Sequence, residues 1–168
     1  MKLVPYFNGQ PASSLRVVNQ QTDVYLRGFT DRGLSSEATK GFNLAVAALA
    51  HEFYHSGAPS IMKACEPILA VIHCSTFSLS YEFDPENPGL YTFGQYVPFI
   101  ILRADLWEAY SLTPLQIAAV ILEEICHYIY SINDETLVKL HVVRLLNQIQ
   151  PVNFEQLYYS FPGTPNLH

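Results

Sequence analysis

A long apolar helix that carries two adjacent glutamates and a histidine dominates this sequence. The stretch from Thr113 to Asn147 reads TPLQIAAVILEEICHYIYSINDETLVKLHVVRLLN and contains two helical patterns joined by a short break. Thr113 and Gln116 fit a capping box, with a proline at the first helical position between them. The apolar run that follows is too continuous for a surface helix, so we expect this helix to be largely buried.

The polar residues inside this run follow the spacing of a metal site. Burying a carboxylate costs several kcal/mol unless it is paired, hydrogen-bonded or bound to a metal. Glu123 and His127 share one helix face, and Glu124 lies roughly 100° around the helix from Glu123. This is the pattern H-E-x-x-H with glutamate at the first position, and it offers two ligands and a carboxylate that activates water. Asp134 can cap a second helix, whose first turn presents Glu135 as a third ligand.

The same segment resembles the core of the ImmA/IrrE-like minimal zincin metallopeptidases. In those proteins an H-E-x-x-H helix precedes a helix that opens on a glutamate and ends in a Leu-Leu pair. The resemblance implies that Glu124 is the catalytic glutamate, that His127 and Glu135 are ligands of Zn2+, and that the substrate is a peptide or protein. The pair Leu145-Leu146 falls where the family has its leucines. The chain departs from the family at Glu123, which stands where the first histidine ligand belongs.

A second candidate site lies at the end of another predicted helix, which runs from Ser35 or Ser36 to about Ser56. This helix ends in HEFYH, a complete H-E-x-x-H in which His51 and His55 are the metal ligands and Glu52 is the base. The alternative is a chance pentad with partly exposed histidines. A zincin needs a third ligand from elsewhere in the chain. The candidates for it are Glu66, His73 and Glu82.

A third hypothesis joins the two helices. Glu52-x-x-His55 and Glu124-x-x-His127 are both E-x-x-H motifs, which di-iron carboxylate bundles use in pairs. Such a bundle also takes one glutamate from each of two further long helices. The proline-rich, strand-like middle of this chain does not supply them, so the di-iron hypothesis ranks last.

The remaining patterns predict an α+β domain with a zincin-like fold, in which a small antiparallel sheet packs on a helical bundle. Alternation indicates strands in TDVYLRGF and STFSLSYEF. The segments LYTFGQY (90–96) and VPFIILR (97–103) are expected to form one or two further strands, and residues 60–74 an apolar helical segment. We expect one domain over residues 1–168, with an extended arm at 1–21 and a loose tail at 161–168. His73, between Ile72 and Cys74, is expected to be a core histidine.

The composition limits the kinds of partner that we expect this chain to bind. The net charge is −6 and the chain has no cluster of Lys and Arg, which argues against nucleic acid. The three cysteines lie in apolar surroundings, and we expect them to be reduced thiols. No signal-peptide pattern and no uncharged apolar run of about 18 residues is found, so we expect no membrane association and a cytoplasmic protein.

The sequence thus predicts a metal-dependent hydrolase, a zincin-type peptidase that uses a metal-activated water. The competing hypothesis is a catalytically inactive zincin-like protein that binds a protein partner or regulates one.

Overall fold

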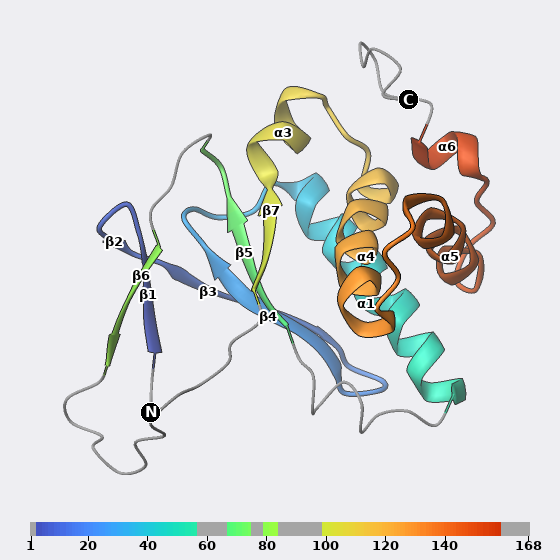
Figure 1. The fold of residues 1–168 in the computed structure, drawn as a ribbon, viewed down its shortest axis with the longest axis horizontal. Helices are drawn as coiled ribbons and strands as arrows, with labels where there is room; N and C mark the ends of the chain where they lie inside the picture. Colours follow the sequence, from blue (N-terminus) through green and yellow to red (C-terminus); the bar gives the residue numbers. More distant parts are fainter. Residues whose placement is uncertain (1–2, 57–66, 75–78, 84–98, 159–168) are drawn as a thin grey trace.

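The computed structural model describes residues 3–56, 67–74, 79–83 and 99–158. Two sheets and a group of helices make up an α+β fold, with the helices gathered on one side of the larger sheet (Figure 1). The predicted class is therefore confirmed at the level of α+β. The predicted tail at 161–168 and the possible strand at 90–96 lie outside the described residues.

The larger sheet has four strands in the order β3-β4-β5-β7. Its strands are β3 (Ser13–Asn19), β4 (Val24–Thr30), β5 (Ile68–Ile72) and β7 (Phe99–Arg103). β3 and β4 are antiparallel, whereas β4, β5 and β7 run parallel. β4 and β5 approach so closely that a Cβ on Gly28 would lie 2.1 Å from the Leu69 carbonyl oxygen. Glycine at this position therefore permits the central pairing.

This sheet corrects two predictions. The sheet beside the helices is mixed, whereas the small antiparallel sheet that the sequence predicts is present as a separate sheet. The part of the 60–74 segment that is described contains a strand and not a helix. The strand is the short apolar run ILAVI, and four of its five residues are buried. A central parallel strand buried on both faces has no alternation, so its pattern cannot be told from that of a buried helix.

The smaller sheet is antiparallel and has the order β2-β1-β6. Its strands are β1 (Leu3–Phe7), β2 (Gln10–Pro11) and β6 (Leu79–Phe83). Asn8 and Gly9 join β1 to β2 with φ values of 50° and 73°, which is the backbone of a tight hairpin with an Asn-Gly turn. The extended arm expected at 1–21 is thus, where described, a set of paired strands.

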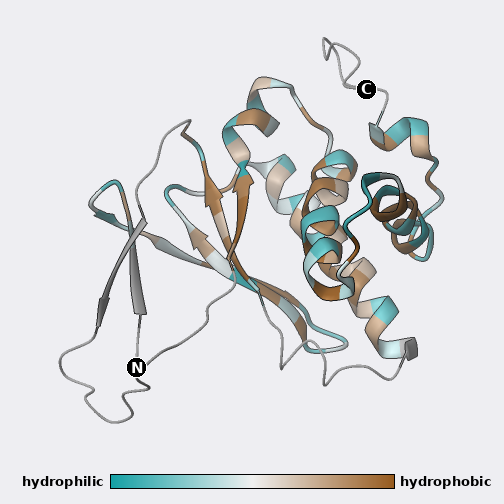
Figure 2. Ribbon diagram, viewed as in Figure 1, coloured by the Kyte–Doolittle hydropathy of each residue, from teal (hydrophilic) through white to brown (hydrophobic). Residues whose placement is uncertain are grey.

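Three long helices lie on one side of the larger sheet and pack against one another. They are α1 (Ser36–Ser56), α4 (Pro114–Tyr130) and α5 (Glu135–Asn147). The short helices α3 (Ala104–Ala109) and α6 (Phe154–Tyr158) follow β7 and end the described chain. α1 and α4 approach each other closely at Gly41, where a Cβ would lie 2.6 Å from the Ile117 side chain. Their apolar faces and the inner face of the sheet form one core, and Figure 2 shows apolar residues on the facing surfaces.

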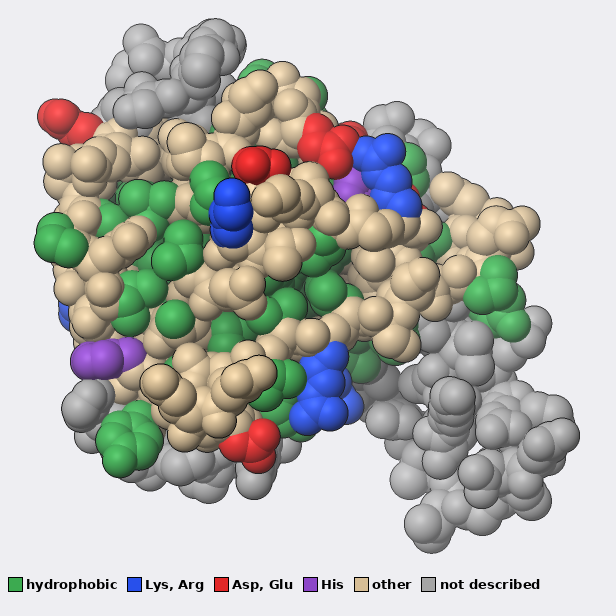
Figure 3. All heavy atoms as spheres, turned by 180° about the vertical axis from the view of Figure 1, so that it is seen from behind, with side chains coloured by type: hydrophobic (Ala, Val, Ile, Leu, Met, Phe, Trp, Pro, Cys, Tyr) green, Lys and Arg blue, Asp and Glu red, His purple; other side chains and the backbone are tan. Residues whose placement is uncertain are grey.

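The predicted starts of α4 and α5 are confirmed. Thr113 and Gln116 form the expected capping box at the start of α4, and the Asp134 side chain accepts a hydrogen bond from the Leu137 N–H at the start of α5. Within the described ranges no single helix is long and apolar enough to span a membrane, and α4 and α5 pass such a test only as a pair bent by 112°. Seen from behind, the surface carries few charged side chains (Figure 3), as the charged fraction of 14% implies.

Candidate functional site

The sharp bend between α4 and α5 brings together two of the predicted metal ligands. Ser131 ends α4 in the left-handed conformation with φ 53°, and the chain turns back so that α5 begins beside the last turn of α4. The His127 Nε2 atom consequently lies 3.6 Å from Oε1 of Glu135. Histidine and glutamate come from the two helices that the sequence pattern named, and they face each other at the bend.

The hydrogen bond at the other ring nitrogen fixes how His127 is oriented. Nδ1 lies 2.5 Å from the carbonyl oxygen of Ile132. Because a carbonyl oxygen only accepts, Nδ1 must carry the proton, and a neutral His127 then presents the Nε2 lone pair toward Glu135. Metal-binding histidines usually donate their second N–H to a carbonyl or carboxylate in this way.

The two adjacent glutamates of α4 have different surroundings. Glu124 is exposed, whereas Glu123 is half-buried beside the Tyr158 hydroxyl at the end of α6. Burial raises the pKa of Glu123, and the hydroxyl offsets part of the rise; burial and the nearby Glu123 also raise the pKa of Tyr158. The Tyr158 hydroxyl is enclosed but makes no hydrogen bond of good geometry within the described residues, so the two groups are neighbours and not a tight pair.

The predicted metal site is therefore only partly assembled. His127 and Glu135 form a pair, but Glu123 is directed toward Tyr158, and Glu124 is on the exposed side of the helix. Among the described residues, no three His, Cys, Asp or Glu side chains are arranged to hold a metal ion. Structural and catalytic zinc sites use three or four protein ligands. The arrangement thus fits two ligands of such a site, and the third ligand stays a prediction.

The glutamate of the HEFYH pentad is committed to an ion pair. Arg144 of α5 donates to both oxygens of Glu52 at 3.1 and 2.8 Å, and the Gln148 amide donates to the same carboxylate at 2.9 Å. The bond from Arg144 is the main cause that lowers the pKa of Glu52 to about 2. A general base works best with a pKa near the working pH, so this carboxylate is suited to joining α1 to α5.

The histidines of that pentad do not complete a described site. His51 lines a separate pocket of about 440 Å³ with Thr22, Tyr54 and Ile149 among its neighbours. The side chain of His55 lies outside the described residues, as does Glu66, one candidate for the third ligand. The di-iron hypothesis gains no support, since Glu52 pairs with Arg144 and Glu124 is exposed.

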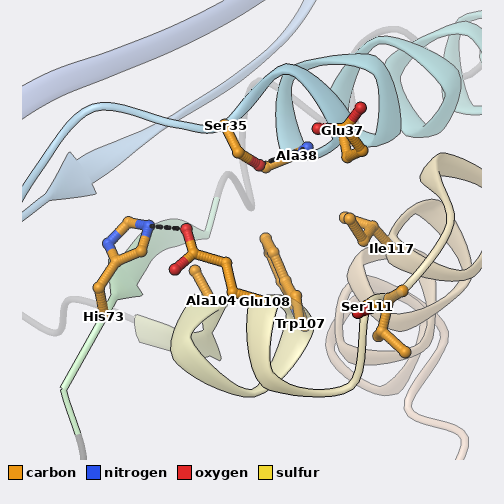
Figure 4. Close-up of a pocket in the computed structure, with 10 residues that line it drawn as sticks. Ser35, Glu37, Ala38, His73, Ala104, Trp107, Glu108, Ser111 and Ile117 are labelled. Atoms are coloured by element: carbon orange, nitrogen blue, oxygen red, sulfur yellow. Dashed lines mark hydrogen bonds and ion pairs between the residues drawn. The ribbon is translucent and has the colours of Figure 1, made fainter.

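A cluster that the sequence did not reveal lies at the carboxyl ends of the parallel strands. Asp31 directly follows β4, and His73 directly follows β5. The His73 Nδ1 atom lies 2.6 Å from Oδ1 of Asp31, and the His73 backbone N–H donates to Oδ2 of the same carboxylate at 3.0 Å. Glu108 of α3 faces the other ring nitrogen (Figure 4). His73 is thus enclosed, as expected, but it is also part of a charged cluster.

One signal would have pointed to this cluster. Asp31 and His73 each stand immediately after a buried strand, and ligand sites in parallel sheets form outside the carboxyl ends of the strands. The apolar run at residues 68–72 hides this signal, because its pattern does not separate a buried strand from a helix.

Neither a protein-family model, nor a curated protein, nor a solved structure matches this chain. The resemblance to the minimal zincins therefore stays an expectation, and function has to be inferred from the geometry of these clusters.

Proposed function

We propose that this chain is a metal-dependent hydrolase of the zincin type, with its centre at the bend between α4 and α5. The observation that carries the proposal is the convergence of His127 and Glu135 at 3.6 Å, with His127 oriented by the Ile132 carbonyl. Exposure supports it too, because 69% of the Glu135 side chain is accessible and a substrate can reach the pair from solvent.

Each residue has a distinct role in this proposal. His127 and Glu135 hold the metal ion, and Glu123, one helical turn before His127, is the remaining ligand candidate. Glu124 is exposed on the same helix and takes the proton from the attacking water. When bound, the ion would polarise the scissile carbonyl and lower the pKa of water to about 7. The substrate is a peptide or protein, and the acidic net charge speaks against nucleic acid. The free thiols of Cys74 and Cys126 support a cytoplasmic location.

A second candidate function is a zincin-like scaffold that binds a protein partner without catalysis. It is favoured by the position of Glu123, which lies beside Tyr158 instead of joining the pair at the bend. On this hypothesis His127 and Glu135 are an ion pair, and metal ions leave the stability of the protein unchanged.

Hydrolysis of a fluorogenic casein substrate separates the two functions. The wild-type chain supplied with zinc is expected to release peptides, and a chelator should abolish the release. Glu124→Gln should retain folding and metal affinity while it loses at least about a hundredfold in rate. Full activity of Glu124→Gln would refute the role given to Glu124. A folded wild-type chain that cleaves no peptide, and whose thermal midpoint is the same with zinc and with chelator, would favour the non-catalytic scaffold.

A further inference from the structure

The carboxyl ends of three parallel strands meet above a pocket that is separate from the α4–α5 bend. β4, β5 and β7 end at Thr30, Ile72 and Arg103, and they are followed by Asp31, His73 and the helix α3. A pocket of about 310 Å³ opens there, and Ile117 lines it from the first turns of α4. Ile117 is about 15 Å along the helix axis from His127, so the pocket and the bend are different sites.

The Asp31 carboxylate fixes the tautomer of the His73 ring. Burial of Asp31 acts to raise its pKa, but the hydrogen bonds from the His73 ring and backbone outweigh it, so the pKa is lowered and the group stays ionised. An ionised carboxylate only accepts, and the Nδ1 atom of His73 must therefore carry the proton. With Nδ1 protonated, the neutral form of the His73 ring has its Nε2 lone pair facing the pocket as a hydrogen-bond acceptor.

The Nε2 atom has no donor among the described residues. Only 2% of the His73 side chain is exposed, and Nε2 is enclosed without a hydrogen bond. The nearest carboxylate oxygen is Oε1 of Glu108, at 3.9 Å, and this oxygen is also an acceptor. The other oxygen of Glu108 is bound by Arg32. In Figure 4, His73 and Glu108 point toward each other at one side of the pocket.

The two facing acceptors, His73 Nε2 and Glu108 Oε1, can share a hydrogen-bond donor placed between them. A single donor atom about 2.9 Å from each would bridge two acceptors that are 3.9 Å apart. A buried polar atom without a partner costs about 1–3 kcal/mol, so the site favours any ligand that supplies this donor.

The rest of the pocket selects the kind of donor. Its walls are largely apolar and include Trp107, Leu112 and Ile117, while Glu37 and Glu108 are its charged lining residues. The positive end of the α1 dipole also faces this side, but Ser35 caps it and Glu37 in the first turn offsets it. Two carboxylates disfavour an anionic ligand. His73 and Glu108 would supply two ligands, whereas a zinc site uses three or four protein ligands.

We propose that this pocket binds a small primary amine with an apolar body. The ammonium group lies between His73 Nε2 and Glu108 Oε1 and donates to both, while the apolar part packs against Trp107 and Ile117. The pocket volume is near the lower end of the range for small-molecule sites, about 300–1,000 Å³, which limits the ligand to a compact molecule. This inference does not depend on the function proposed for the α4–α5 bend.

Phenethylamine is a suitable probe, because it joins one ammonium to one ring. In an NMR titration of the full chain we expect saturable binding with a Kd of about 1 mM, together with shifts of the His73 ring signals. 3-Phenylpropionate has a similar length and the opposite charge, and it should bind at least about tenfold more weakly. Equal binding of the two probes, or no shift at His73 up to about 10 mM amine, would overturn the proposal.

A pair of charge-matched variants tests the role of Glu108. Glu108→Gln keeps the shape but removes the charge, and it should weaken phenethylamine about fivefold to tenfold. Asp23→Asn removes the same charge at the opposite end of β4, and it should leave the affinity unchanged. An equal loss in both variants would mean that overall charge, and not this pocket, holds the amine. Glu108→Gln with wild-type affinity would also contradict the proposed contact.

Discussion

Glu52 on α1 and Glu123 on α4 lie in similar five-residue patterns but in opposite electrostatic surroundings. Glu52 accepts three hydrogen bonds from Arg144 and Gln148, and its pKa falls to about 2. Glu123 is half-buried, and burial raises its pKa, although the Tyr158 hydroxyl and Lys139 favour its charged form. The folded state therefore favours the ionised form of Glu52 and disfavours the ionised form of Glu123.

The arginine partner of Glu52 comes from α5, which packs against both helices. Near its end it supplies Arg144 to Glu52 on α1, and at its start it supplies Glu135 to His127 on α4. The same helix therefore supplies the ion-pair partner of Glu52 in one pentad and places Glu135 beside His127 of the other. A five-residue motif does not decide the role of its residues; the helix that packs against it does.

Removing the positive charge of Arg144 should produce the largest effect on stability. Arg144→Gln leaves the Glu52 carboxylate with one amide donor, and we expect the free energy of unfolding to fall by about 1–2 kcal/mol at pH 7. The value is kept low because nearly half of the Arg144 side chain is exposed. Urea unfolding measures the change. Lys40→Gln, at an exposed position of the same helix as Glu52, is the control and should change stability little. Equal effects in the two variants would show that the ion pair is unimportant.

Neutralising Glu123 should change the free energy of unfolding in the opposite direction and by a smaller amount. Glu123→Gln removes a charge that burial opposes, so we expect a gain of about 1 kcal/mol in the free energy of unfolding at pH 7. Glu124→Gln, at the adjacent exposed position, should be neutral within about 0.5 kcal/mol. A clear loss of stability in Glu123→Gln would mean that the ionised carboxylate has a partner that stabilises it.

The smallest expected effect is the change of these stability differences with pH. The folded pKa of Glu52 lies below its ordinary value of 4.5, so its contribution is complete above that pH and is lost as the pH falls from 4.5 toward 2. The folded pKa of Glu123 lies above 4.5, so its unfavourable contribution develops as the pH rises through 4.5. The difference between wild type and Glu52→Gln, and that between wild type and Glu123→Gln, should therefore both shrink between pH 7 and pH 3.5, with opposite signs. A difference that keeps its size would contradict the assigned shift.

Local signals explain what the sequence could predict. The capping box of Thr113 and Gln116 and the cap at Asp134 depend on residues within one helical turn, and both are present. The approach of His127 to Glu135 depended on only a short bend, so its spacing could be read from the pattern.

Contacts between distant segments could not be predicted. Glu52 and Arg144 are 92 positions apart, and nothing near HEFYH indicates that an arginine will reach it. The Asp31–His73 contact requires β4 and β5 to be parallel neighbours, and the apolar run of β5 has no period that separates strand from helix.

Zinc content tests the central claim most directly, which is that the α4–α5 bend holds the metal and the HEFYH pentad does not. Purified wild type, His127→Ala and His55→Ala would each be loaded with zinc, dialysed and examined by elemental analysis. We predict about one zinc ion per chain in the wild type and in His55→Ala, and a loss of most of it in His127→Ala. Retention in His127→Ala with loss in His55→Ala would move the site to α1, and a wild-type chain that binds no zinc would contradict the metal-dependent function.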